Sequence, residues 1–155
     1  MDGGRRRILK GTGGAAVLGL AMAAGLFRTG SAWADWNKAA FDTKSLADAV
    51  KAMGGGAPAE SKDITITSPD IAENGAVVPF TIASKVPNTE SMALLVEKNP
   101  NILAANFQIP QGTEAWINTR VKMGQTSNVH ALVKADGKYY FATKEIKVTL
   151  GGCGG

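Results

Sequence analysis

Short stretches in which apolar and polar residues alternate fill the sequence from position 62 to position 150. In residues 115–123, for example, the apolar Ile117, Val121 and Met123 alternate with the polar Asn118, Arg120 and Lys122. A period of two places apolar side chains on one face of a β-strand, and that face must be buried against another layer. Seven strands are predicted on this basis, at residues 62–68, 76–83, 91–97, 102–109, 115–123, 127–134 and 139–150.

Turn-forming residues separate the predicted strands. Glu73-Asn74-Gly75 is one such turn, and Ala135-Asp136-Gly137-Lys138 predicts a tight hairpin because Asp-Gly tolerates positive φ. Short strands at regular spacing are typical of an antiparallel sandwich. We therefore predict an all-β, immunoglobulin-like antiparallel β-sandwich of about seven strands. Pro79 lies inside a predicted strand, which predicts an edge strand or a bulge at that point.

A helical pattern precedes the strands, in residues 35–53. Leu46, Ala49, Val50 and Met53 recur at the i, i+3, i+4, i+7 spacing of one helix face. The run Gly54-Gly55-Gly56 follows directly and predicts the end of the helix. We expect four successive parts, which are a signal (1–34), a helical segment with a glycine-rich linker (35–60), the sandwich (61–150) and a glycine arm (151–155).

The first 34 residues have the features of an export signal. Arg5 and Arg6 open the pattern R-R-x-φ-L-K, an apolar run follows, and Ala32 and Ala34 frame a small-residue cleavage site. This order predicts a twin-arginine signal and a periplasmic protein. An uncleaved membrane anchor is the alternative, but the apolar run is interrupted by glycine and shorter than the ~20 residues of a spanning helix.

Removal of this signal changes the charge balance of the chain. The signal holds five of the 17 Lys and Arg residues and one of the 13 Asp and Glu residues, so 12 of each kind remain. A chain with no net charge has no general attraction for nucleic acid or for an anionic membrane. The sequence therefore predicts neither as a partner.

The only cysteine stands in the last five residues, flanked by glycines. Gly151, Gly152, Gly154 and Gly155 surround Cys153 and carry no side chains. Glycine has the greatest backbone freedom of any residue, so we expect a thin, pliant arm that can enter several different active sites. In an exported protein, an unpaired cysteine indicates a reactive thiol or intermolecular pairing. We predict covalent attachment of a substrate at Cys153.

Three other functions are compatible with parts of the sequence. A structural or adhesive exported β-sandwich would use Cys153 only for an intermolecular disulfide. A nucleophilic hydrolase would need His130, the single histidine, as its base, yet His130 is predicted on a strand as a surface or partner-facing residue. A metal chaperone would need a ligand cluster, which one cysteine, one histidine and five methionines do not form. We expect no metal and no cofactor.

The sequence resembles the SoxY family of sulfur carriers. Carriers of this family end in G-G-C-G-G, which matches residues 151–155 at all five positions. Weaker matches lie at Gly75-Ala76-Val77-Val78-Pro79, Val96-Glu97-Lys98-Asn99-Pro100, Thr119-Arg120-Val121-Lys122-Met123 and Asp136-Gly137-Lys138-Tyr139.

The resemblance implies a place in periplasmic thiosulfate oxidation. It implies that the carrier is not itself an enzyme and that it forms a heterodimer with a SoxZ-like subunit. Cys153 would be joined oxidatively to thiosulfate by the haem enzyme SoxAX. The dimanganese hydrolase SoxB would release sulfate, and the molybdenum-haem dehydrogenase SoxCD, where present, would oxidise the remaining sulfane sulfur, held as a cysteine persulfide.

Overall fold

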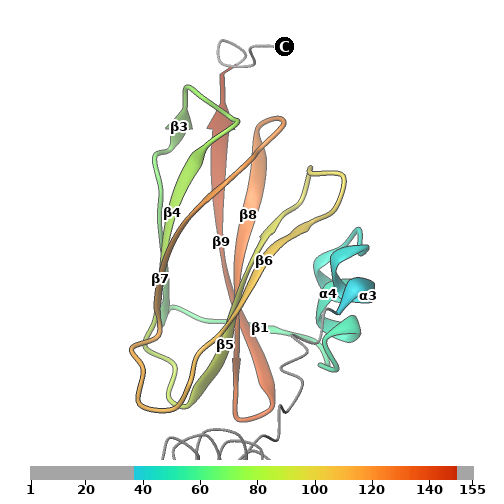
Figure 1. Cartoon of the computed structure of the whole chain (residues 1–155), viewed down its shortest axis with the longest axis vertical. Helices are drawn as coiled ribbons and strands as arrows, with labels where there is room; N and C mark the ends of the chain where they lie inside the picture. Colours follow the sequence, from blue (N-terminus) through green and yellow to red (C-terminus); the bar gives the residue numbers. More distant parts are fainter. Residues whose placement is uncertain (1–36, 150–155) are drawn as a thin grey trace, which may run out of the picture. The chain divides into compact units, whose positions relative to one another are not determined.

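Residues 37–149, which the computed structural model describes, fold into two packed β-sheets with two short helices against one of them (Figure 1). The larger sheet has six strands, in the order β1-β9-β8-β5-β6 with β3 also paired to β9, and the smaller has the order β2-β4-β7. This confirms the predicted all-β, immunoglobulin-like sandwich. The strands are β1 Ala59–Glu60, β2 Ile64–Thr67, β3 Ile71–Ala72, β4 Val78–Ser84, β5 Thr89–Val96, β6 Leu103–Gln108, β7 Trp116–Val121, β8 Ser127–Ala135 and β9 Lys138–Val148.

The seven predicted strands correspond to β2 and to β4 through β9. All pairs among these seven are antiparallel. The two additional strands, β1 and β3, pair in parallel with β9. Each has only two residues, which is too short for a period of two to be visible in the sequence.

The main core lies between the two sheets. Val129, Ala131 and Val133 of β8 face it, and Phe80 and Ile82 of β4 meet them from the smaller sheet. These are the side chains that the alternating pattern predicts to share a face. Burial of this continuous apolar layer is the main stabilising contribution to such a domain.

A second core covers the opposite face of the larger sheet, beneath the helices. Ala93 and Leu95 of β5 and Leu132 of β8 pack there against Ala49 and Val50. Every residue of β5 from Ser91 to Val96 is therefore buried, because this strand has a protein layer on both faces.

The predicted helical segment consists of two helices, α3 (Lys38–Phe41) and α4 (Leu46–Ala52). A residue outside the two helices stabilises the break between them: the backbone N–H of Ile102 donates to the carbonyl of Thr43 at 3.3 Å. The Ser45 hydroxyl caps α4 by accepting from the N–H of Asp48. Gly54, with φ of 82°, ends α4 as the glycine run predicts.

Two local predictions have different outcomes. Asp136 and Gly137 both have positive φ, 49° and 71°, and join β8 to β9 as the predicted hairpin. Pro79 lies in β4, which is the central strand of the smaller sheet and not an edge strand. The proline is tolerated because β2 pairs with β4 only as far as Thr81, so Pro79 has a strand neighbour on the β7 side alone.

Candidate functional site

The residues predicted to act directly lie outside the part of the chain that the structure describes. This holds for Cys153, for the glycines 151, 152, 154 and 155, and for the signal residues Arg5, Arg6, Ala32 and Ala34. The last described residue is Thr149, at the end of β9. The structure therefore defines the base from which the predicted arm begins, and we call this base the arm root (residues 147–149).

Three hydrogen bonds donated by backbone N–H groups hold the arm root. The N–H of Lys147 donates to the carbonyl of Asp70 at 2.9 Å, and the N–H of Thr149 donates to the carbonyl of Ala72 at 3.1 Å. From the other side, the Thr126 hydroxyl accepts from the N–H of Val148 at 3.0 Å. With partners on two sides, the arm root is fixed to the domain as far as Thr149, one residue beyond the end of β9.

Gly75 makes the closest packing contact at the arm root. It is buried, and a Cβ placed on it would lie 2.5 Å from the carbonyl oxygen of Met123 and 2.8 Å from a methyl group of Val148. Its own carbonyl accepts from the N–H of Met123 at 2.7 Å. Only glycine allows this approach, so Gly75 determines how closely the loop after β3 packs on the end of β9.

An ion pair fastens β3 to β9 from the outside. Lys144 Nζ lies 2.9 Å from Asp70 Oδ1 and donates to the carbonyl of Ser68 at 2.6 Å. The hydrogen bond from Lys144, together with its charge, lowers the pKa of Asp70 from its usual value. Because the Asp70 side chain is 86% exposed, solvent screens this pair and its contribution to stability is small.

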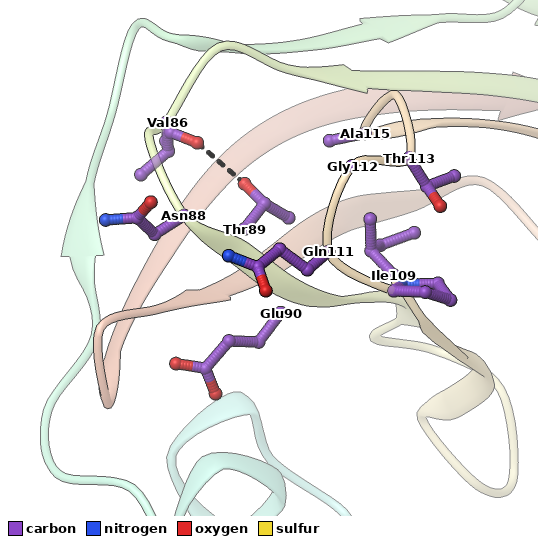
Figure 2. Close-up of a pocket in the computed structure, with 10 residues that line it drawn as sticks. Val86, Asn88, Thr89, Glu90, Ile109, Gln111, Gly112, Thr113 and Ala115 are labelled. Atoms are coloured by element: carbon purple, nitrogen blue, oxygen red, sulfur yellow. Dashed lines mark hydrogen bonds between the residues drawn. The ribbon is translucent and has the colours of Figure 1, made fainter.

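A cleft of about 490 Å³ lies at the other end of the domain (Figure 2). The loops between β4 and β5 and between β6 and β7 form its walls. Glu90 is the only charged residue that lines it, and it is paired to Lys134 at 2.9 Å, which lowers the pKa of Glu90. The cleft therefore offers no cationic side chain to a sulfur oxyanion.

Distance also separates this cleft from the predicted carrier residue. Glu90 accepts from the N–H of Gly137, at the hairpin where β9 begins, and the 11 residues of β9 span about 33 Å. Cys153 is four residues beyond Thr149, so its Cα can lie at most about 14 Å from that residue. A group carried on Cys153 cannot reach the cleft of the same chain.

His130 is buried, with 6% of its surface exposed, which corrects the prediction of a surface residue. Its Nε2 lies 2.8 Å from Glu97 Oε1 and its Nδ1 lies 2.8 Å from Thr143 Oγ1. The Phe141 ring meets the imidazole edge-on at 6.2 Å. Both ring nitrogens are thus engaged within the sheet, and neither is free to act as a base for Cys153. His130 is buried because residues of neighbouring strands contact it from both sides. The alternating pattern within β8 does not reveal these neighbours.

Within residues 37–149, no group of three or more His, Cys, Asp or Glu side chains is arranged to hold a metal ion. No helix in the same part of the chain is long and apolar enough to cross a membrane.

Replacement of His130 with alanine is expected to lower the free energy of unfolding by about 2 kcal/mol, because two hydrogen bonds are lost within a packed layer. Urea unfolding measures this change, and Glu145→Ala is the control because Glu145 is exposed on the neighbouring strand β9. Alkylation of Cys153 by iodoacetamide should keep its wild-type rate in the folded variant. Wild-type stability with a slowed alkylation would instead assign His130 to thiol activation.

Comparison with known proteins places the chain in a family. The family model described as "Sulfur oxidation protein SoxY" matches residues 49–153, which is more than half of the chain and extends to Cys153. The structure of the sulfur carrier protein SoxY from Chlorobium limicola f thiosulfatophilum is 34% identical, with a TM-score of 0.59, over 66% of this chain and 96% of that chain.

Two further comparisons add nothing to this assignment. A structure of the bacterial superantigen toxic shock syndrome toxin-1 has 13% identity and a TM-score of 0.40 over 56% of this chain and 99% of that chain, a similarity too low to support an argument. No curated protein sequence matches the chain. The match to the family model and the similarity to a solved SoxY structure agree with the sandwich described above, and the chain belongs to the SoxY family.

Proposed function

We propose that this protein is a periplasmic carrier that holds the sulfur intermediates of thiosulfate oxidation covalently on Cys153. The observation that carries the proposal is the SoxY family match, which runs through the sandwich and ends at Cys153 itself. Cysteine is suited to the task because its thiolate is a strong nucleophile and its bonds to sulfur are reversible.

The division between a held base and a glycine arm supports this function. The arm root is held by hydrogen bonds to Ala72 and Thr126, whereas residues 151–155 consist of glycines around one cysteine. We propose that these five residues swing from a defined starting point and carry Cys153 into partner active sites. A fixed base limits the volume within which the thiol can move. The glycines carry no side chains, so the arm stays narrow enough to enter a partner's active site.

The chemistry is assigned to partner enzymes. In the loading step, the Cys153 thiol and thiosulfate form an S–S bond, and one proton and two electrons leave, the electrons passing to a haem enzyme of the SoxAX kind. Water then attacks the terminal sulfonate in a hydrolase of the SoxB kind, which releases sulfate and leaves a persulfide on Cys153. A dehydrogenase of the SoxCD kind takes electrons from that sulfane sulfur while water supplies the oxygens of a new sulfonate, and a second hydrolysis releases sulfate and returns the Cys153 thiol.

The stable partner in this proposal is a SoxZ-like subunit that forms a heterodimer with the sandwich. Residues 1–34 are proposed to direct export by the twin-arginine route. That route moves folded proteins, so the heterodimer would assemble before export.

Intact-mass spectrometry followed by peptide mapping tests which cargo is bound and where. In protein purified from thiosulfate-grown cells, we expect sulfonate and sulfane adducts on the peptide that holds residues 151–155, and dithiothreitol should remove them. Protein from cells grown without reduced sulfur is the control and should lack them. Adducts confined to other residues, or none in actively oxidising cells, would refute the proposed attachment at Cys153.

A further inference from the structure

Large apolar side chains are exposed at few positions in residues 37–149, and two of them flank the arm root. Ile71 is 56% exposed, Val77 is 50% exposed and Trp116 is 50% exposed. Ile71 belongs to β3 and is paired with Lys147 of β9. Val77 precedes β4, and its N–H donates to the carbonyl of Asn74. We refer to residues 70–77 as the arm-root segment.

The arm-root segment is held in place although Ile71 and Val77 face solvent. Ala72 is buried in the main core, and Gly75 packs against Met123 and Val148. In Figure 1, β3 and the start of β4 lie at the same end of the domain as the end of β9. The two exposed side chains are therefore presented on a fixed support, at the end from which the arm begins.

The length of the arm determines what must meet this end of the domain. Cys153 lies four residues beyond Thr149, so its Cα stays within about 14 Å of it. Active sites that accept a narrow probe are recessed below the enzyme surface. To receive the sulfur, an enzyme must therefore bring the rim of its active-site entrance against the end of the sandwich that carries the arm-root segment.

We propose that Ile71 and Val77 form a docking surface for the active-site rim of the enzymes that act on the group bound to Cys153. This inference rests on the proposed carrier function and adds to it the surface that makes contact. Isolated exposed apolar residues are common and need no explanation, but here the reach of the arm forces contact at this end.

The nature of the surface suits short encounters with several enzymes. Two exposed apolar side chains bury little area, and small interfaces are typical of transient complexes. The nearest ion pair, Lys144 with Asp70, is internal to the domain and already satisfied. Partners are expected to offer apolar side chains at the rim of the active-site entrance, opposite Ile71 and Val77.

The test compares the heterodimer carrying Ile71→Thr and Val77→Thr with wild type. Threonine keeps the branched shape and strand preference of these residues while replacing an apolar branch with a hydroxyl, which weakens apolar contact. With purified loading enzyme and hydrolase at low carrier concentration, we expect kcat/KM for adduct formation on Cys153 and for sulfate release to fall about tenfold. The control is Trp116→Thr, which changes an exposed apolar residue paired with Ala83, far along β4 from the arm-root segment, and should leave both rates unchanged.

Further readouts separate the possible causes. Alkylation of Cys153 by iodoacetamide should match wild type, which shows that the arm itself is intact. If the double variant is loaded at the wild-type rate, or if Trp116→Thr slows the enzymes equally, the docking surface is refuted while the carrier function stands. If the variant loses its SoxZ-like subunit instead, the surface belongs to the stable interface and the proposal is wrong. Loading that persists in Cys153→Ser would refute the carrier function itself.

A measurement on the wild-type heterodimer avoids any folding defect in the variants. Hydrogen exchange in the presence of the loading enzyme should slow selectively in residues 70–77. Exchange that slows elsewhere, with no change in this segment, would also overturn the proposal.

Discussion

Cells in which Cys153 is replaced by serine are expected to lose thiosulfate oxidation completely, while the protein folds and accumulates normally. The hydroxyl of serine cannot form the S–S bond to thiosulfate on which every later step of the proposed cycle depends. The expected loss is total because this thiol is the only one in the chain. Thiosulfate-dependent oxygen uptake measures the effect, and a thermal unfolding curve equal to that of wild type shows that the fold is unaffected.

The same variant separates the carrier from a purely structural or adhesive sandwich. A structural role for Cys153 predicts only the loss of disulfide-linked dimers, with thiosulfate oxidation unchanged. Gly154→Ala provides a matched control in the same five residues, since it keeps the thiol and adds one methyl group. We expect this variant to retain loading at a reduced rate. Normal thiosulfate consumption by Cys153→Ser cells would refute the covalent carrier.

Replacement of Gly75 with alanine is expected to give the largest loss of stability among single-methyl additions in the described glycines of the strand region. The added Cβ would meet the Met123 carbonyl oxygen at 2.5 Å and a Val148 methyl at 2.8 Å. The carbonyl belongs to the backbone of Met123, whose N–H donates to the carbonyl of Gly75. The clash can therefore be relieved only by a backbone shift at Gly75 or Met123. Overpacking of this kind costs about 3 kcal/mol, which lowers Tm by roughly 10 °C in a domain of this size.

Gly124→Ala is the matched control for this substitution. Gly124 lies in the loop next to Met123, and nothing lies within 4 Å of a Cβ placed on it. Its Tm should stay close to that of wild type. In Gly75→Ala, the amides of Val148 and Thr149 should also exchange faster than those of β8. A Gly75→Ala protein as stable as Gly124→Ala would show that the arm root does not need this close contact.

These two predictions concern two parts of the proposed carrier, the thiol of Cys153 and the base of its arm. In the proposed carrier, Cys153 would supply the bond to the cargo, and Gly75 helps to hold the base from which the arm begins. A loosened base leaves the thiol chemically intact, so simple alkylation of Cys153 should proceed in Gly75→Ala. Transfer by partner enzymes should suffer more, because docking requires a defined relation between the arm and the end of the sandwich.

The alternating pattern in the sequence was sufficient to predict the seven long strands and the sandwich. Each of these strands has enough residues for the period of two to appear, as in Val129, Ala131 and Val133, which share the main core. The same pattern placed His130 on the opposite face correctly. The glycine-flanked Cys153 was likewise evident without coordinates, because it depends on residue type and neighbours alone.

Contacts between residues distant in the chain decided the rest. The pairing of β3 with β9 joins residues more than 70 positions apart through backbone groups, and backbone groups leave no signature in a sequence. The burial of His130 depends on Glu97 and Thr143 from two neighbouring strands. The sequence by itself determined the seven longer strands, their faces and the position of the single cysteine. Only the tertiary structure decided which segments hold the arm root and which apolar side chains surround it, because those depend on packing between strands and not on local periodicity.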